Sequence, residues 1–446
     1  MSHSLAAHRL LLAVLILLFA ARVGASVVVI HAGHLIVEPG RPVLVRQSIL
    51  VENGLVTAVK EGFVPADEVI DLSNAWVMPG LIDMHTHVTV TMDIDSANPA
   101  ADFMPAVLGR PAARVLATVR RAQAILRNGF TTVRNLGDPA SVTYDLRDAI
   151  DAGIVDGPRI VGVEPQFGVA GGDYDAFAFG ERAELESLFR SRGTCSGPVD
   201  CVRVVREEVH RGAGVIKLRL AAQSARDPNS GPMETPEELQ AIVATAHRLN
   251  RRVAVHSAGS DAANQMALDA GVDTLEHGPL SDRNIATMVQ HGTAYTPTLL
   301  AAKVATGKLG VEPGYYDRVV DSVARAYRAG VPVLFGSDLP VMPSNRTPEE
   351  FLLLHHAGLT SVDALKAATV NAAQALGMSD SLGTLAPGKA ADIIALARDP
   401  IADLREMSHV MFVMKGGKVI LARETGSQPT HRQSGPCLPA VRESAP

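Results

Sequence analysis

Between Gly80 and about Gly383 the chain alternates short apolar runs with amphipathic segments of helical periodicity. Two examples are TPEELQAIVATAHRLN before RRVAVHSAG, and DSVARAYRAG before VPVLFGSD. Each helical segment ends at Gly or Asn and each apolar run ends in polar residues, which is typical of βα units in a parallel sheet. A chain of 446 residues has room for one large barrel and a smaller satellite. We therefore predict an α/β fold with a (β/α)8 barrel over residues 80–383.

The two flanks of this region have a β pattern instead. Residues 26–79 contain three short apolar runs and the hairpin-forming pair Asn53-Gly54, and residues 384–421 contain two runs and the pair Gly416-Gly417. Neither flank has a helical period. We expect the flanks to pair with each other and to form one small β-sandwich domain from both chain ends.

The first 25 residues have the pattern of a signal peptide. Arg9 precedes an apolar run of 12 residues, and small side chains before Ser26 fit a cleavage site. A spanning helix needs roughly 20 apolar residues, so an uncleaved anchor is the weaker reading. The expectation is therefore an exported protein, periplasmic or extracellular, with no stable membrane insertion after cleavage. The polar, proline-containing segment 422–446 is expected to be a disordered tail.

Charge and cysteine content exclude several classes of partner and site. The net charge is −6 with no basic block, so no nucleic-acid partner is expected. Cys195 and Cys201 either form a loop disulfide, which an oxidising compartment permits, or remain two free thiols. Cys437 is expected to be unpaired. Because no cysteine has the spacing of a zinc site, a bound metal must use nitrogen and oxygen ligands.

Polar residues with metal-binding chemistry end several of the apolar runs. His85 and His87 alternate along one run, so their imidazoles project to the same side of a strand. Lys217 ends the run GAGVIKL, where a lone ammonium is costly to bury. Each residue alone has an ordinary structural explanation, such as packing or helix capping. In a barrel, however, all of these strand ends face one rim, so the set points to a metal site. The other members of the set are His256, His277 and Asp338.

This series of strand ends resembles the amidohydrolase superfamily, whose members have a TIM-like barrel. The resemblance covers nearly the whole mature chain and includes AWVMPGLIDMHTHV, GFTTVRNLGD and LKAATVNAAQALGMSDSLGTLAPGKAADIIAL. These segments look like the branch that holds imidazolonepropionase-like enzymes, Xaa-Pro dipeptidases and amidases that cleave ochratoxin. In two-metal members of that branch the strand-four lysine is carboxylated by CO2. Carried over by position, the resemblance implies that His85, His87 and Asp338 hold one metal, that His256 and His277 hold the other, and that carboxylated Lys217 bridges them.

The activity implied is hydrolysis of an amide bond with two divalent metals, consistent with zinc, lying roughly 3.5–4 Å apart. Asp338 is expected to take the proton of the attacking water and to deliver it to the leaving amine. The substrate implied is a dipeptide or an N-acyl amino acid that carries a free carboxylate and releases a C-terminal amino acid. Arg219, two residues beyond Lys217, is expected to bind that carboxylate. Tyr295 and Asp173 are further candidates for substrate contact.

Two departures from the branch leave the substrate less defined than the metals. Dipeptidases of this branch usually carry His or Tyr just after the strand-five ligand, whereas this chain has Ser257-Ala258-Gly259. They also show a Gly-Gly-His turn where this chain has Gly171-Gly172-Asp173. Two other functions remain open: a single-metal deaminase or cyclic-amide hydrolase of the imidazolonepropionase type, and a non-catalytic binding protein. Lys217 argues against the single-metal form. A homo-oligomer is compatible with the sequence, which does not fix the oligomeric state.

Overall fold

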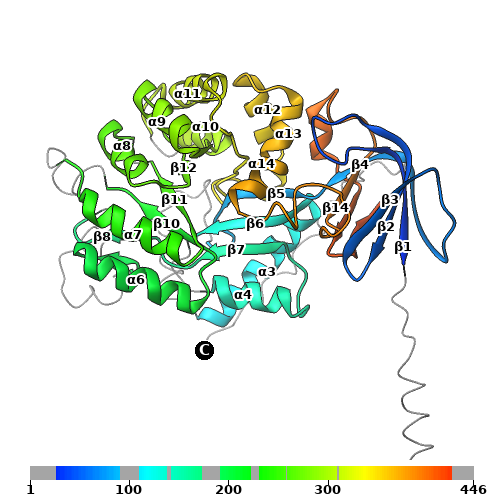
Figure 1. Cartoon of the computed structure of the whole chain (residues 1–446), viewed down its shortest axis with the longest axis horizontal. Coiled ribbons are helices and arrows are strands. Elements are labelled where there is room, and N and C mark those ends of the chain that lie inside the picture. Colours follow the sequence, from blue (N-terminus) through cyan, green and yellow to red (C-terminus); the bar gives the residue numbers. More distant parts are fainter. Residues whose placement is uncertain are drawn as a thin grey trace, which may run out of the picture.

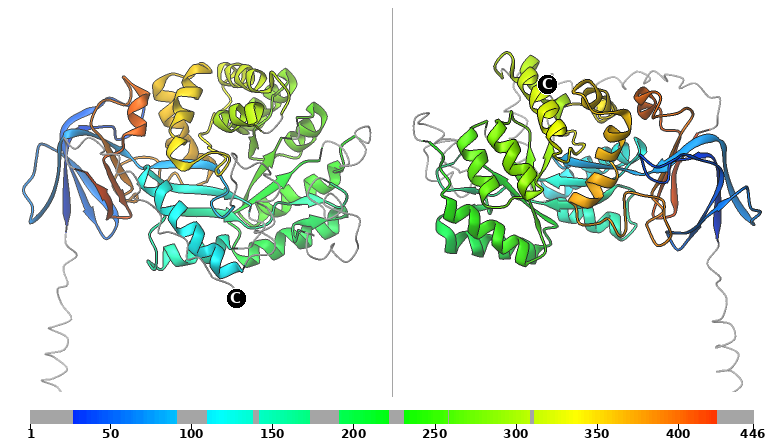
Figure 2. Two further views of the ribbon diagram at one scale, coloured as in Figure 1. Left: turned by 180° about the vertical axis from the view of Figure 1, so that it is seen from behind. Right: turned by 45° about the horizontal axis from the view of Figure 1, so that its top comes forward.

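Both ends of the chain contribute strands to a single seven-stranded sheet. The computed structural model describes residues 27–90, 110–137, 142–172, 191–221, 231–257, 259–308 and 311–423. The strands of this sheet, in their order across it, are β16 (Lys418–Ala422), β15 (Phe412–Lys415), β14 (Ile393–Leu396), β4 (Glu68–Pro79), β1 (Val28–Leu35), β2 (Leu44–Glu52) and β3 (Leu55–Glu61). In Figures 1 and 2 the sheet lies at one end of the molecule, beside the helical part.

The tips of two hairpins in this sheet contact each other. Asn53 and Gly54 both have positive φ, as a tight two-residue turn requires, and so do Gly416 and Gly417. A Cβ on Gly54 would lie 2.8 Å from the carbonyl oxygen of Gly416, so the two turns approach too closely for side chains. The strands are therefore hydrogen-bonded into one sheet whose two ends meet at these turns and share an apolar core.

The region between the two flanks contains two groups of parallel strands. The first group is β5 (Leu81–Thr86), β6 (Phe130–Leu136) and β7 (Arg159–Val163), and the second is β10 (Val215–Arg219), β11 (Arg252–His256), β12 (Thr274–Glu276) and β13 (Ala294–Thr296). Hydrogen bonds and isolated bridges link the groups at both edges. Gly214 N–H donates to Gly162 O across the β7–β10 edge. On the other side, parallel bridges join Tyr295 to Val333 and Leu339 to Thr86.

Helices cover the outside of these strands, as Figure 1 shows. They are α3 (Pro111–Arg127), α4 (Thr143–Asp151), α6 (Gly197–Arg211), α7 (Pro236–Arg248), α8 (Asp261–Asp269), α9 (Asp282–His291), α10 (Leu299–Lys308), α11 (Tyr315–Ala329), α12 (Glu349–His356), α13 (Ser361–Ala367) and α14 (Val370–Ala375), with 3-10 turns η3 (Ser344–Arg346) and η4 (Leu404–Ser408). No described helix is both long and apolar enough to cross a membrane. A two-strand ladder of β8 (Gly168–Val169) and β9 (Thr194–Cys195) adjoins β10, because Phe167, just before β8, forms a parallel bridge with Leu218.

Local sequence signals explain where several helices begin and end. A capping box starts α7, with the Thr235 side chain accepting from Glu238 N–H and the Glu238 carboxylate accepting in return. Helix α11 ends at Gly330, whose φ of 91° suits a left-handed C-cap. Helix α6 begins beside a disulfide between Cys195 and Cys201, which decides between the two alternatives for these cysteines.

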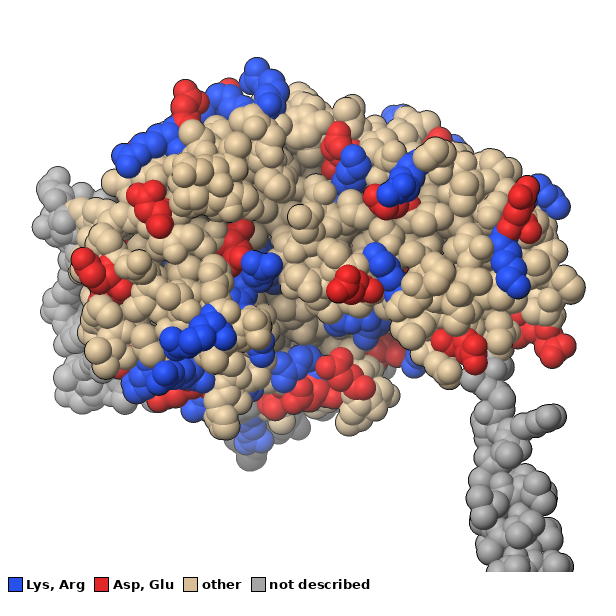
Figure 3. All heavy atoms as spheres, in the orientation of Figure 1, with Lys and Arg blue, Asp and Glu red and all other residues tan. Residues whose placement is uncertain are grey.

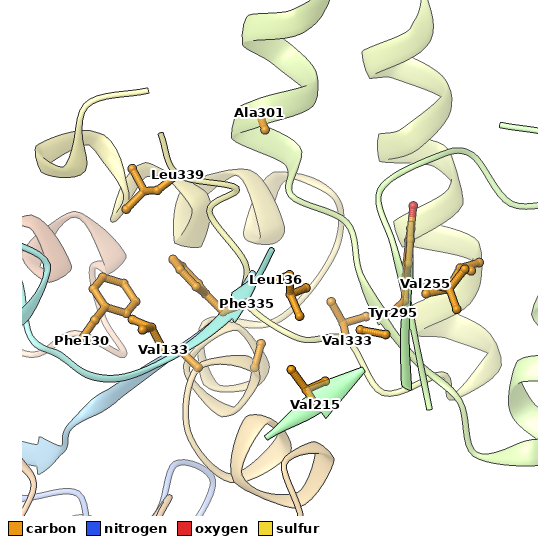
Figure 4. Close-up of a cluster of buried hydrophobic side chains, with 14 of the residues drawn as sticks. Phe130, Val133, Leu136, Val215, Val255, Tyr295, Ala301, Val333, Phe335 and Leu339 are labelled. Carbon is orange, nitrogen blue, oxygen red and sulfur yellow. The ribbon is translucent and has the colours of Figure 1, made fainter. Parts of the chain in front are cut away.

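The core lies between the parallel strands and the helices. Figure 4 shows Phe130 and Phe335 facing each other, with ring centroids 5.1 Å apart. Phe335 also packs on Phe351 of α12, at 4.5 Å. On the face of the molecule that Figure 3 shows, acidic and basic side chains are interspersed. The aromatic rings thus join a strand of the first group to a helix on the outside through one apolar core.

A single glycine separates the end sheet from the first parallel strand. Strand β4 ends at Pro79, and β5 begins at Leu81. A Cβ on Gly80 would lie 2.4 Å from the hydroxyl of Thr131 on β6, so no larger residue fits there. The chain therefore passes from the end sheet directly into the strand that carries His85.

Candidate metal centre

The predicted ligands come together where the parallel strands end. Oδ1 of Asp338 lies 3.4 Å from Nε2 of His85 and 3.4 Å from Nε2 of His87. The ring centroid of His277 lies 4.4 Å from that of His85 and 4.8 Å from that of His256. Ligand atoms of His85, His277 and Asp338 all lie within 4.8 Å of one another. Five of the six proposed ligands thus form one connected cluster.

Backbone geometry directs two of these ligands inward. His277 and Asp338 have φ of 63° and 55°, in the left-handed region that non-glycine residues rarely adopt. Neighbouring strands hold both conformations, because His277 N–H donates to Thr296 O and Asp338 N–H donates to His85 O. Strained residues of this kind are concentrated at functional sites, where the surrounding structure maintains them.

Each of three histidines has a hydrogen-bond partner at Nδ1, and Nε2 of His85 and of His87 lies close to Asp338. His85 Nδ1 donates to Glu276 Oε2 at 2.8 Å, and His87 Nδ1 donates to the carbonyl of Gly137 at 3.1 Å. His277 Nδ1 lies 2.6 Å from the hydroxyl of Thr298. Such partners fix the ring orientation, and an acceptor at Nδ1 leaves Nε2 deprotonated and able to bind a metal. His85 Nε2 is buried and, among the described residues, has no hydrogen-bond partner.

The partner of His85 belongs to a buried charge network that the sequence did not reveal. Glu276 is fully buried, and its Oε1 accepts from Arg134 Nη2 at 2.6 Å and from the Thr274 hydroxyl at 2.5 Å. Arg134 also donates through Nε to Met84 O at 2.6 Å. The guanidinium balances the carboxylate and fastens β6 to β5. Arg134 and Glu276 both occur inside apolar runs of the sequence. Glu276 directly precedes the predicted ligand His277, and this position was the only sign in the sequence that it belongs to the site.

Asp83 is a second residue that the sequence analysis missed. Its Oδ1 accepts from the backbone N–H groups of His85, at 3.1 Å, and Ser337, at 3.0 Å. Burial raises the pKa of Asp83 to about 7. The side chain joins the segment before His85 to the segment before Asp338, and so sets the spacing of these two ligands.

Lys217 lies in β10 with its amine inside the protein. The residue is 1% exposed, and its Nζ has no hydrogen-bond partner among the described residues. Burial lowers the pKa of Lys217 to about 7, against the opposing attraction of Glu276 and Asp338. The charge of Lys217 in turn contributes to the lowered pKa of His85, His256 and His277, which places the amine within electrostatic range of all three.

The protonation states of the cluster suit metal binding. Burial holds the pKa of His85, His256 and His277 well below the ordinary value, so their imidazoles are neutral at pH 7. Burial alone would raise the pKa of Asp338, but His277 and His87 outweigh it and keep the pKa below its usual range. Neutral imidazoles and an ionised carboxylate are the forms that bind divalent cations. The donor set of nitrogen and oxygen therefore fits such a metal.

The three predicted substrate contacts have different outcomes. Arg219 ends β10, and its register partner on β11 is His256, so it lies at the rim beside a proposed ligand. Tyr295 is fully buried, and its hydroxyl donates to Gly278 O at 2.6 Å. Figure 4 shows it among the apolar side chains, so its prediction as a direct substrate contact is corrected: the ring belongs to the core. Asp173 lies outside the described residues.

Comparison with known proteins identifies the family to which this chain belongs. The model of the amidohydrolase family matches residues 76–420, from the end of β4 into β16. The chain belongs to the amidohydrolase family. This amidohydrolase is therefore a metal-dependent hydrolase with a barrel-type α/β fold and an additional domain, and the resemblance described above is confirmed at that level.

The relatives of this amidohydrolase include the named branches. An uncharacterized protein of Mycobacterium tuberculosis is 29% identical over 374 residues, which cover 79% of this chain and 87% of that protein. The imidazolonepropionase of Mesorhizobium japonicum is 26% identical over 380 residues, which cover 81% and 87%. Among solved structures, a Xaa-Pro dipeptidase with bound methionine has a TM-score of 0.79 and 29% identity, over 88% of this chain and 99% of that one. The ochratoxinase of A. niger has a TM-score of 0.75 and 25% identity, over 89% and 96%.

Proposed function

We propose that this amidohydrolase is a two-metal amidase that releases a C-terminal amino acid from a dipeptide or an N-acyl amino acid. In this proposal the parallel strands and the segment 333–339 form an eight-stranded (β/α)8 barrel. His85, His87 and Asp338 hold the first divalent metal, His256 and His277 hold the second, and Lys217, carboxylated by CO2, bridges them. Zinc is the proposed metal, because the ligands are nitrogen and oxygen atoms.

The buried, unpartnered amine of Lys217 is the observation that carries the two-metal proposal. An ammonium without a partner is costly inside a protein, which is why the pKa of Lys217 falls to about 7. A neutral amine can add to CO2 at neutral pH and, with release of one proton to solvent, gives an anionic carbamate. The carbamate turns the unpartnered amine of Lys217 into an anion with two oxygen atoms that can bind metals beside the histidines. A site with a single metal does not need such a bridging carbamate.

The protein's own residues have clear roles in amide cleavage. When bound, divalent cations would supply Lewis acidity and would make a metal-bound water molecule more acidic. Asp338 stays ionised and lies 3.4 Å from two ligand nitrogens, so it can accept the proton of the attacking water. It can then deliver that proton to the leaving nitrogen. The neutral histidines hold the metals without competing for this proton.

Arg219 supports a substrate with a carboxylate on its leaving side. It follows Lys217 by two residues on β10, so both side chains project to the same face of the strand. A guanidinium at the rim can bind a carboxylate through two parallel hydrogen bonds and orient the scissile carbonyl. Relatives fit this substrate class: a Xaa-Pro dipeptidase, a prolidase complexed with N-methylphosphonate-L-proline, and an ochratoxinase.

The proposal is tested by metal analysis together with a dipeptide library. Wild-type protein should hold about two metals per chain, and zinc with bicarbonate should restore activity after chelation. Lys217→Ala should lose metal and activity, and a short carboxylic acid should partly restore both. The matched control is Lys418→Ala, which removes only an exposed ion pair with Asp156 on the outside of the protein. Full metal content and full activity in Lys217→Ala would refute the bridging carbamate.

A further inference from the structure

Amide hydrolysis is accelerated by a hydrogen-bond donor aimed at the oxygen on which negative charge develops. The residue after the ligand His256 is Ser257, which is buried and whose hydroxyl oxygen is packed against Gly278, where an added Cβ would lie 2.2 Å from it. The turn after His277 offers another direction of approach. It contains Gly278, and two tyrosines contact its peptide groups.

One of these tyrosines, Tyr315, starts helix α11 at the rim of the site. Helices of βα units run antiparallel to their strands, so the first residue of α11 lies at the same end of the molecule as the ligands. The Tyr315 hydroxyl is 3.3 Å from the backbone nitrogen of Gly278, the residue that follows His277. The residue is partly buried and packs against the main apolar core.

Among the described residues, none accepts the hydrogen of the Tyr315 hydroxyl. Gly278 N–H donates to this oxygen, and in the described part of the chain the hydroxyl makes no donated bond. Tyr295 differs, because its hydroxyl donates to the carbonyl of Gly278. Burial raises the pKa of Tyr315, and the carboxylate of Asp338 raises it further, so the phenol keeps its proton at neutral pH.

We propose that Tyr315 donates a hydrogen bond to the carbonyl oxygen of the scissile amide and stabilises the negative charge that forms there. This proposal rests on the amidase function proposed above. No proton is transferred, because the phenol acts only as a donor while the carbon becomes tetrahedral. The bond from Gly278 N–H orients the phenol oxygen and polarises its O–H group toward the substrate. Tyr315 is then a catalytic residue on the side of the site formed by His256 and His277.

The test compares Tyr315→Phe with Tyr316→Phe. Tyr316 is the adjacent tyrosine of α11, and its ring lies 6.0 Å from the Lys303 amine. Tyr315→Phe should lower kcat on a cleaved dipeptide by about 10²-fold, the typical effect of removing one oxyanion donor, with little change in KM. It should weaken calorimetric binding of N-methylphosphonate-L-proline similarly, and its zinc content should equal that of wild type. Tyr316→Phe should behave as wild type in every assay.

Three results would overturn the assignment. Unchanged kcat and phosphonate affinity in Tyr315→Phe, with an active wild type, would refute the role of Tyr315 and leave the amidase function standing. Loss of zinc in parallel with activity would make Tyr315 a positioning residue for His277. A wild type that neither cleaves dipeptides nor binds the phosphonate would refute the proposed function together with this one.

Discussion

Replacing Glu276 with glutamine should switch the tautomer of His85 and weaken metal binding. In the wild type the carboxylate accepts from His85 Nδ1 at 2.8 Å and from Arg134 at 2.6 Å. A glutamine side chain has the same shape but only one acceptor oxygen, to which Arg134 donates. Its NH₂ group then faces Nδ1 of His85. The imidazole must accept at Nδ1 and carry its hydrogen on Nε2, the atom that a metal needs.

Two magnitudes follow from this geometry. Losing a ligand's hydrogen-bond partner typically lowers metal affinity by roughly 10- to 100-fold, which is about 1.4–2.7 kcal/mol. The metal-free protein should also lose about 3–5 kcal/mol of unfolding free energy, because Arg134 is 1% exposed and is left without its counter-charge. Zinc affinity is measured by competition with a fluorescent chelator, and stability by urea unfolding in the presence of a chelator.

Thr274→Val is the matched control for Glu276→Gln. It removes the hydroxyl that donates to Glu276 and accepts from Arg134, and it leaves the bond between Glu276 and His85 in place. This variant should lose stability by about 1–3 kcal/mol while keeping zinc affinity within about threefold of wild type. If Glu276→Gln is destabilised yet binds zinc as tightly as wild type, the proposed orientation of His85 by Glu276 is wrong.

Three further predictions concern the substrate, the effect of pH and the export of the chain. Arg219→Ala should raise KM for acid substrates about tenfold or more and hardly change that for amidated ones, and equal wild-type kinetics on both forms would contradict a carboxylate contact. The pKa of Glu350, raised by burial from 4.5 to about 8, exceeds its unfolded value, so stability should fall between these pH values by up to roughly 5 kcal/mol. Urea unfolding should show that Glu350→Gln lacks this fall. N-terminal sequencing of exported protein should begin near Ser26, whereas recovery of Met1 from membranes would favour an anchor.

The strand-end pattern predicted the placement of the ligands better than that of their surroundings. His85, His277 and Asp338 could be grouped because a parallel strand places its last residue at a common rim, whatever the side chains around it. Their ligand atoms lie within 4.8 Å of one another. The prediction for Tyr295 also relied on its position in a strand alone. Its ring lies in the core, and its hydroxyl donates to a backbone carbonyl.

The supporting residues could not be read from the chain because their partners are remote in sequence. Arg134 and Glu276 are 142 positions apart and occur inside runs that otherwise look like buried strands. Nothing local distinguishes such a buried ion pair from two surface charges. Tyr315 is 37 positions from Gly278 and begins a helix, where a tyrosine has no special meaning in the sequence. Only the packing of α11 against the strand ends brings it to the site.

Because β4 continues through Gly80 into the strand that carries His85, the order in which the chain folds affects the metal centre. The last residues of β4, Met78 and Pro79, have β14 as their ladder partner, and β14 comes from the far end of the chain. During synthesis on the ribosome, the end of β4, which leads into the strand that carries His85, therefore lacks its ladder partner until almost the whole protein has emerged. Pairing over so long a span of chain is slow compared with local helix formation. A truncation that removes β14 should thus leave the end of β4 without its ladder partner, although every proposed ligand is still present.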